Sequence, residues 1–454
     1  MGFLCREQAS RDSLIQTIEN LPLRICHLSF KRHAQTSSTS RRLGAMLPGI
    51  FKPQTRMKTK ILVLLGCWIA SHSAFAQPAA NPALDRAARA DNAFGFKLLS
   101  ETRKALPGGN VFQSPMGMAL ALAMAGNGAQ GQTLQEIAVT LGLPGLTPDE
   151  WNAGNKLLLA HLLALDPKIK LEIANSIWTQ TGAGIKPEFV ASVRDAYQAE
   201  AASVDFASPG TVNRINDWVS QNTHGKIATI FDPPLPRDLR LVVLDAIYFK
   251  GTWDTQFDPK LTRDQPFNLR GGQTAQRPRM SRKERMSCFE TADFQAVALP
   301  YASRQASLYV FLPRENLDKF IQDLTPENWA AWMGRFSVRD GTLELPKFKL
   351  ENKYELTGEL KAMGMPRAFG PEADFGGIST GERLYISQAL QKTFVEVNEE
   401  GTEAAAVSGV SVRPMIARAP SAPFTMIVDR PFYMAIRENQ TGTILFHGAI
   451  EDPK

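Results

Sequence analysis

The chain has few cysteines. Three of the four lie before residue 77: Cys5, Cys26 and Cys67. Only Cys288 lies after it. A single cysteine cannot form an intrachain disulfide, so we expect the folded part of the chain to be stabilised by packing rather than by cross-links.

Histidines are also few. Residues 77–454 hold three of the six, and no two are close enough in sequence to suggest a metal-binding pair: His161, His224 and His447. With a single cysteine besides, this spacing argues against a zinc site. No glycine-rich loop of the Walker type is present either. We therefore expect neither a metal nor a cofactor.

An excess of positive charge is present, but only near the N-terminus. The net charge of the chain is +6. Residues 1–56 hold nine Lys and Arg and three acidic residues, and residues 57–76 hold two lysines, so residues 77–454 carry 40 basic and 42 acidic side chains. This balance argues against nucleic acid as a partner of the folded part. One local basic cluster is expected to be a solvated loop: Arg279, Arg282, Lys283 and Arg285.

The apolar run Ile61–Ala70 is too short to span a bilayer. It follows the basic start Met57–Lys60 and precedes the small-x-small sequence Ala74-Phe75-Ala76, which is the pattern of a secretory signal peptide. We expect residues 57–76 to be this signal, with cleavage near Ala76. The mature protein would then be secreted to the extracellular space or the periplasm, with no membrane association.

Domain boundaries follow from the signal. Because the signal starts at an internal methionine, residues 1–56 are a doubtful N-terminal extension, consistent with a mispredicted start. Residues 77–90 are expected to be a linker and residues 91–454 to form one domain. Two alternatives stay open: the apolar run is a buried helix of the domain, or it belongs to a lipoprotein signal ending at Cys67.

Helical and strand-like patterns divide the domain. Apolar residues recur at helical spacing in the first half: 85–100, 116–125, 133–141 and 155–165. The expected strands lie mostly in the second half: 176–179, 239–249, 296–300, 306–312, 341–345, 383–386, 424–428, 432–437 and 443–447. The run 239–249 is rich in Val, Leu and Ile and suits a central strand buried on both faces. The whole predicts an α+β domain with large sheets.

The stretch Val397–Ala406 has an unusual composition. It follows a strand-like run, yet it offers a glycine and three alanines where a domain would turn or pack. The segment Gly401–Pro423 is long, and long loops without evident structure are usually functional. Alternate residues are small at one end and β-branched at the other: Thr402, Ala404, Ala406, Ser408, Val410 and Val412. One buriable face at period two is the pattern of a strand.

The octet Glu399–Ala406 resembles the reactive-loop hinge of the serpins, the serine protease inhibitor family. Five further segments resemble serpin signatures and occur in the serpin order: Asn110–Pro115, Ile215–Val219 with Gly225–Ile227, Tyr248–Trp253, Leu345–Phe348 and Asp429–Phe432. The resemblance extends from Asp91 to the C-terminus. It implies the serpin fold, in which helices pack around large β-sheets and a reactive-centre loop is exposed.

The resemblance also implies a suicide-substrate inhibitor rather than an enzyme. The target serine protease would cut the loop and form a covalent acyl complex, and the hinge side of the loop would then insert into the central sheet. Insertion must precede deacylation, so inward-facing hinge residues must be small, whereas Glu403 stays in water. Gly401 is expected to supply a backbone bend. The expected hinge is Glu399, Glu400, Gly401, Thr402, Glu403, Ala404, Ala405 and Ala406. The alternative is a non-inhibitory serpin that acts as a binding or chaperone-like protein.

By family analogy the scissile bond follows the seventeenth residue counted from Glu399, which gives Met415-Ile416. An unbranched apolar side chain suits the primary pocket of elastase-like, chymotrypsin-like or subtilisin-like enzymes. The rival bond is Arg418-Ala419, which would suit a trypsin-like enzyme.

A polar cluster departs from the family pattern. Serpins commonly place Ser, Asn and His beneath the point where the sheet parts, and the matching positions here are Ser114, Gly117, Asp245 and Gln391. Since Gln391 can both donate and accept hydrogen bonds, we expect a remodelled cluster around it and Asp245. Alternatively, both are ordinary polar residues at strand ends.

Two further expectations concern partners and chemistry. No Lys/Arg-rich helix face occurs between Thr147 and Lys170, so glycosaminoglycan activation is not expected. The protein is expected to be a monomer. The remote alternative is a serine hydrolase, because Ser379 lies in a G-x-S-x-G sequence with Asp429 and His447 downstream. That motif needs a strand before the serine and a helix after it, whereas a strand-like segment follows here.

Overall fold

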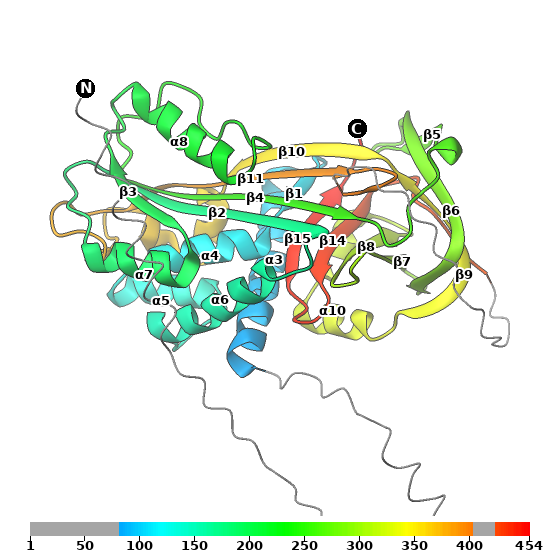
Figure 1. The fold of residues 1–454 in the computed structure, drawn as a ribbon, viewed down its shortest axis with the longest axis horizontal. Coiled ribbons are helices and arrows are strands. Elements are labelled where there is room, and N and C mark those ends of the chain that lie inside the picture. Colours follow the sequence, from blue (N-terminus) through cyan, green and yellow to red (C-terminus); the bar gives the residue numbers. More distant parts are fainter. Residues whose placement is uncertain (1–80, 403–422) are drawn as a thin grey trace, which may run out of the picture. The chain divides into compact units, whose positions relative to one another are not determined.

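The computed structural model describes residues 81–402 and 423–454, which form helices arranged around two β-sheets (Figure 1). One sheet has six strands, in the order β10 (Phe348–Glu355), β11 (Ile386–Val397), β12 (Gly401–Thr402), β4 (Leu241–Thr252), β2 (Ile169–Gln180) and β3 (Glu200–Val204). The other has nine, in the order β1 (Val111–Gln113), β15 (Ile444–Ile450), β14 (Phe432–Glu438), β8 (Ala306–Pro313), β7 (Phe294–Pro300), β6 (Thr274–Glu290), β9 (Ser337–Pro346) and β13 (Phe424–Ile427), with β5 (Arg263–Asn268) paired to β6.

The helices lie largely in the first half of the sequence. Along the described chain they are α3 (Pro82–Ala105), α4 (Pro115–Gly126), α5 (Gly131–Thr140), α6 (Pro148–Leu163), α7 (Pro187–Tyr197), α8 (Gly210–Asn222), α9 (Leu317–Gln322), α10 (Pro326–Met333) and α11 (Thr357–Ala362), with 3-10 turns η1 (Pro259–Leu261) and η2 (Pro366–Phe369). The expected α+β class is confirmed, and so are the four expected helices; three match to within five residues at their ends, whereas the helix expected at 155–165 begins seven residues earlier, at Pro148.

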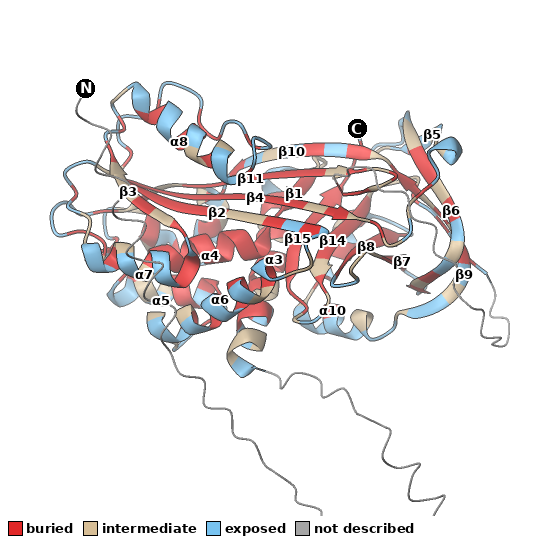
Figure 2. Ribbon diagram, in the orientation of Figure 1, coloured by how far each residue is buried: buried red, intermediate tan, exposed pale blue. Residues whose placement is uncertain are grey.

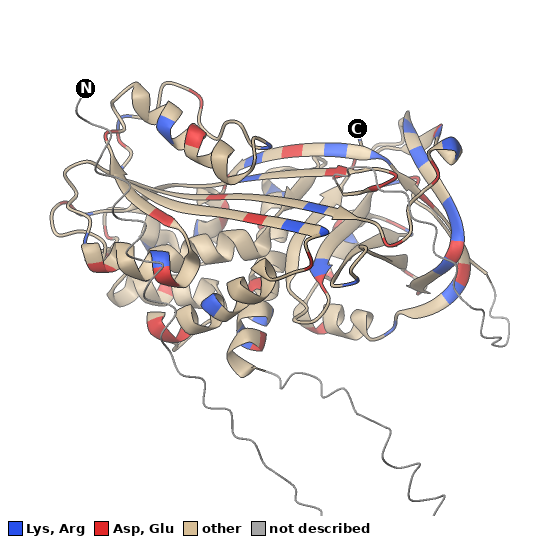
Figure 3. Ribbon diagram, in the orientation of Figure 1, with Lys and Arg blue, Asp and Glu red and all other residues tan. Residues whose placement is uncertain are grey.

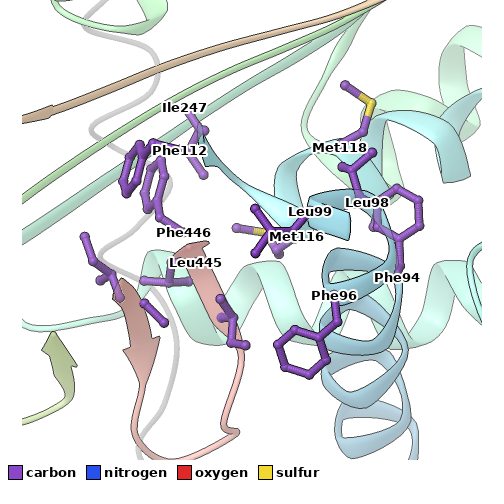
Figure 4. Packing of buried hydrophobic residues seen from close by; sticks show 14 of the residues in the cluster. Phe94, Phe96, Leu98, Leu99, Phe112, Met116, Met118, Ile247, Leu445 and Phe446 are labelled. Carbon is purple, nitrogen blue, oxygen red and sulfur yellow. The ribbon is translucent and has the colours of Figure 1, made fainter. Parts of the chain in front are cut away.

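Helix α4 lies at the centre of the fold. Ser114 accepts a hydrogen bond from the Gly117 amide and so caps its first turn, and all twelve residues of the helix are buried. A helix that is apolar on all sides must be covered on all sides. Figure 4 shows how this is achieved: side chains of α4 and α3 pack together beside Phe446 of the nine-stranded sheet and Ile247 of the six-stranded sheet.

Strand β4 is the predicted central strand and is confirmed as such. Apart from Lys250 and Thr252, its residues are buried (Figure 2). One face packs against α4 in the main core, and the other face packs under α8 in a second apolar cluster, on the opposite side of the sheet (Figure 1). Both faces are covered, which explains the unbroken apolar run.

Helix α3 begins earlier than expected. Asn81 accepts a hydrogen bond from the Ala83 amide and Pro82 occupies the first turn, a favourable start that the apolar spacing alone does not reveal. Buried Ala87 and Ala90 lie in this first part of the helix. The linker expected over residues 77–90 therefore overlaps α3 from Pro82 onward.

Two local predictions were wrong. The strand expected at 383–386 begins only at Ile386, its last residue. The basic cluster expected to be a solvated loop lies in strand β6, where Arg279 and Arg282 are buried. Arg279 pairs with Glu344 at 3.1 Å, and Arg282 pairs with Glu284 at 3.1 Å. These ion pairs neutralise the cations, and Figure 3 shows acidic residues among the basic ones along β6 and β9.

Across the described ranges, none of the helices is long and apolar enough to cross a membrane. Within the same ranges, no group of three or more His, Cys, Asp or Glu side chains is placed to hold a metal ion.

Candidate functional site

Strands β4 and β11 are paired along most of their length and part at one end. Their parallel register runs from Leu241 opposite Ile386 to Tyr248 opposite Phe394. Beyond this point the short strand β12 lies between them and is antiparallel to both. The hinge of the expected loop thus enters the six-stranded sheet at the end where β4 and β11 separate.

Gly401 is required by the close approach of two backbones. A Cβ at this position would lie 2.1 Å from the carbonyl oxygen of Gly251 on β4. Gly401 is not one of the described residues that have a positive φ. The close approach of the two strands is therefore sufficient reason for a glycine here, and the bend expected where the loop folds over stays a prediction.

Thr402 points into the fold. It is fully buried, and its hydroxyl lies 2.7 Å from the Tyr301 hydroxyl. Tyr301 in turn stacks on Trp253, with ring centroids 4.8 Å apart. Thr402 therefore lies on the buried face, as the alternation of residues predicts, and its hydroxyl has a specific polar partner there.

The turn that joins β11 to β12 is held by hydrogen bonds. Asn398 Oδ1 accepts from the amides of Glu400 and Gly401, and its own carbonyl accepts from Trp253 Nε1 at 2.9 Å. The Trp253 amide donates to the Glu400 carbonyl at 2.9 Å. Both the entry and the exit of the turn are therefore attached to the segment that follows β4.

Glu399 anchors the hinge electrostatically. Its carboxylate accepts from Lys347 Nζ at 3.0 Å and from the Thr262 hydroxyl at 2.8 Å, while only 8% of the residue is exposed. Burial alone would raise the pKa of this carboxyl, but the bonds from Lys347 and Thr262 outweigh it and the pKa is lowered. The charged form of Glu399 is thus the form that this site stabilises.

The rest of the loop lies outside the described residues. This applies to the remaining hinge positions and to both candidate scissile bonds: Glu403, Ala404, Ala405, Ala406, Met415-Ile416 and Arg418-Ala419. Their assignment stays a prediction from the sequence.

The four residues of the expected polar cluster, Ser114, Gly117, Asp245 and Gln391, are brought together where α4 meets the six-stranded sheet. Gln391 Nε2 donates to the Ser114 carbonyl at 2.8 Å and to Asp245 Oδ2 at 2.5 Å, and its Oε1 accepts from the Ser114 amide at 3.1 Å. Ser114 Oγ donates to the Leu445 carbonyl at 2.7 Å. The cluster therefore links both sheets through the first turn of α4.

Asp245 explains the glycine at position 117. A Cβ on Gly117 would lie 2.4 Å from Asp245 Oδ1 and 2.5 Å from Asp245 Oδ2. Asp245 is fully buried, and burial raises its pKa to about 7, although the hydrogen bond from Gln391 opposes the shift. Gln391 and Asp245 are opposite each other in the β4–β11 register, in the middle of both strands, so they are not residues at strand ends.

The arrangement needed for a serine hydrolase is not present among the described residues. Ser379 Oγ donates to the Ala183 carbonyl, Asp429 pairs with Arg430 at 2.9 Å, and His447 Nδ1 lies 3.2 Å from the Tyr433 hydroxyl. Burial lowers the pKa of His447 to about 3. None of the three triad candidates is bonded to another, and β11 follows the serine where the motif requires a helix.

Several partners of the site were missed. They are Lys347, Thr262, Trp253, Tyr301 and a second amide beside the cluster, Asn175. Lys347 and Trp253 do lie within segments that carry the family resemblance, but no local pattern says which distant residue each one contacts.

A six-stranded sheet in which β4 and β11 separate at one end, with the first residues of a long loop paired between them, is the arrangement that the serpin resemblance implies. Comparison with known proteins agrees with this class. The family model described as Serpin, serine protease inhibitor, matches residues 89–453. Iripin-8 of Ixodes ricinus is 38% identical over 379 residues, which cover 80% of this chain and 92% of Iripin-8.

Two solved structures extend the comparison. Human thyroxine-binding globulin complexed with thyroxine superposes with a TM-score of 0.75 and 27% identity, covering 82% of this chain and 100% of the other. Serpin48 of the insect Tenebrio molitor gives a TM-score of 0.73 and 29% identity, covering 83% and 100%. The chain belongs to the serpin family, whose members are generally protease inhibitors rather than enzymes, with some non-inhibitory exceptions.

Proposed function

We propose that this serpin inhibits serine endopeptidases as a suicide substrate. The observation that carries the proposal is the position of β12: two hinge residues already lie between β11 and β4, antiparallel to both. Continuing β12 in the same direction would extend the strand along the gap and separate the two parallel neighbours. The geometry therefore supports insertion of the rest of the hinge.

The chemistry is that of an interrupted proteolysis. The serine Oγ of the target protease attacks the scissile carbonyl, an ester bond to the loop forms, and the peptide bond breaks to release the new amino terminus. Insertion of the hinge side then carries the acylated protease away before water cleaves the ester. The driving force is a fold that is kinetically trapped and gains ladder hydrogen bonds and apolar burial on insertion.

The side chains of the hinge suit rapid insertion. Thr402 is already buried, and the next positions of the same parity are alanines, which add little volume to the core. We propose Met415-Ile416 as the scissile bond, with Arg418-Ala419 as its rival, and elastase-like, chymotrypsin-like or subtilisin-like enzymes as targets. The inhibitor is proposed to act as a secreted monomer, released by signal cleavage near Ala76, without glycosaminoglycan.

A binding role is the second candidate. Thyroxine-binding globulin is a structural neighbour that was solved in complex with thyroxine, so a serpin fold alone does not decide between the two functions. The small residues of the hinge favour inhibition, because a binding protein has no need of them.

The test is to mix residues 77–454 with a pancreatic-type elastase and separate the products on a denaturing gel. A covalent adduct supports inhibition, whereas cleavage without an adduct refutes it. A matched pair of variants sharpens the result, since Ala404→Arg and Ala405→Arg differ only in the parity of the substituted position. Ala404→Arg should turn the inhibitor into a substrate, because a charge must enter the core, while Ala405→Arg should still form the adduct.

A further inference from the structure

Two buried oxygen atoms beside the polar cluster lack a hydrogen-bond donor. They are Asp245 Oδ1 on β4 and Asn175 Oδ1 on β2, and neither has a partner in the described part of the chain. Asp245 is fully buried, and Asn175 is 3% exposed. A buried acceptor without a donor is destabilising, so each such atom calls for an explanation.

The strand register places the two side chains next to each other. β2 and β4 are antiparallel, and Asn175 is directly opposite Asp245. Directly opposite residues project from the same face of a sheet. Both side chains also contact Gly117. Asn175 Nδ2 donates to the Gly117 carbonyl at 3.3 Å, and a Cβ on Gly117 would lie 2.4 Å from Asp245 Oδ1.

The orientation of the Asn175 amide is set by Gly117. A carbonyl oxygen can only accept, so the NH2 group of Asn175 must point to it, and Oδ1 is the atom that remains. On Asp245, Oδ2 already accepts from Gln391, which again leaves Oδ1. Two acceptors cannot satisfy each other, but a proton on Asp245 Oδ1 turns the pair into one donor and one acceptor.

We propose that Asp245 is protonated in the uncut protein, that it donates this proton to Asn175, and that loss of the proton accelerates opening of the six-stranded sheet. The proposal rests on the loop-insertion function proposed above. In the closed sheet an ionised Asp245 is fully buried and short of donors. When β4 separates from β11, water reaches the carboxylate and stabilises its charge, so the ionised form favours the open sheet.

Among the described residues, no side chain that contacts Asp245 titrates near neutral pH. Its neighbours Gln391 on β11, Asn175 on β2 and Ser114, which caps α4, do not titrate, and α4 carries no charged residue at all. On β15, His447 stays neutral because burial lowers its pKa to about 3. The raised pKa of Asp245, about 7, comes from burial, and no charged side chain contributes to it.

The expected dependence on pH follows from linkage. Asp245 binds its proton more tightly in the closed sheet than in the opened one, so raising the pH favours opening until the closed form has itself lost the proton. The rate at which the uncut loop inserts spontaneously should therefore rise by up to about tenfold per pH unit between pH 5 and 7 and level off above pH 7.

The test compares the wild type with Asp245→Asn, whose amide can donate to Asn175 and accept from Gln391 at every pH. Insertion is followed by incubating uncut protein between pH 5 and 9 and measuring the gain of resistance to urea unfolding. The variant should show one slow rate throughout, equal to that of the wild type at pH 5. Asp91→Asn is the matched control, because Asp91 is also buried with a raised pKa but lies in α3, and it should keep the wild-type profile.

A second measurement is spectroscopic. Infrared difference spectra of uncut protein between pH 5.5 and 8.5 should show a buried protonated carboxyl that is lost at the higher pH, and this band should persist in Asp91→Asn, which removes the other buried carboxyl with a raised pKa. The proposal is overturned if the insertion rate of the wild type does not change with pH, or if Asp245→Asn keeps the wild-type dependence on pH. If that variant fails to fold, the absence of the protonated carboxyl overturns it. These results are independent of the gel assay, which alone decides whether insertion traps a protease.

Discussion

Cleavage of the loop should raise the thermal stability of the protein, and the size of the effect can be worked out from the sheet. In the uncut protein β4 and β11 pair directly at eight positions, from Leu241 opposite Ile386 to Tyr248 opposite Phe394. A strand inserted between them removes this parallel ladder and makes two antiparallel ones, so the net gain is one ladder of similar length.

The magnitude follows from the number of bonds. Eight ladder hydrogen bonds at about 1 kcal/mol each amount to about 8 kcal/mol. Unfolding entropies near 2 cal/mol/K per residue give roughly 0.7 kcal/mol per degree for a domain of this size, so the melting temperature should rise by about 10 °C. Burial of the inward-facing side chains adds to this figure, and the conformational entropy lost by the inserted segment subtracts from it.

The assay is a pair of thermal melts, followed by circular dichroism, on intact protein and on protein nicked by a trace of elastase. Ala404→Arg serves as the control, because its nicked form should gain little. Equal melting temperatures for intact and nicked wild type would refute the idea that the uncut fold lies above its free-energy minimum.

Three other substitutions test single contacts. Lys347→Ala removes the cation beside Glu399 and should speed spontaneous insertion, measured as the ratio of variant to wild-type rates. Because the pKa of Glu399 is lowered in the fold, this effect should be present above pH 4.5 and fade as the pH falls below it. Thr402→Val leaves the buried Tyr301 hydroxyl without its partner and should cost about 1–3 kcal/mol in urea unfolding of the uncut protein. Gly117→Ala forces a Cβ against the carboxylate of the polar cluster and should cost a similar amount, about 1–3 kcal/mol, in the same assay; an unchanged midpoint would mean that the cluster has room to spare.

Much of the fold could be predicted because its central elements carry local signals. Helix α4 is apolar on every side, and β4 is a long apolar run, so the local sequence of each predicts that it is buried. Strand β6 has no such signal, because its arginines become compatible with burial only through partners such as Glu344 on another strand. A single sequence does not reveal those pairings.

The candidate site also has one part that the local sequence predicts and another part that it does not. The hinge is a contiguous segment with period-two spacing, so the pattern of alternate residues is enough to place Thr402 on the inward face. The anchor of Glu399 depends on Lys347, which is 52 positions away and becomes a neighbour only through the register of β10 and β11. Likewise Asn175 meets Asp245 only because β2 and β4 pair in one particular register.

The hinge anchor and the polar cluster resist the same opening from two places. Glu399 is tied to Lys347 and Thr262 at the end of the sheet where β12 enters, whereas Gln391 bridges Asp245 and α4 near the middle of the ladder. An entering strand must pass the first before it reaches the second. The anchor at Glu399 is therefore expected to control how insertion begins, and the cluster to control whether it runs to completion. Loss of the proton on Asp245 would then act after the anchor has released, because an ionised carboxylate lowers the cost of separating β4 from β11 around the cluster.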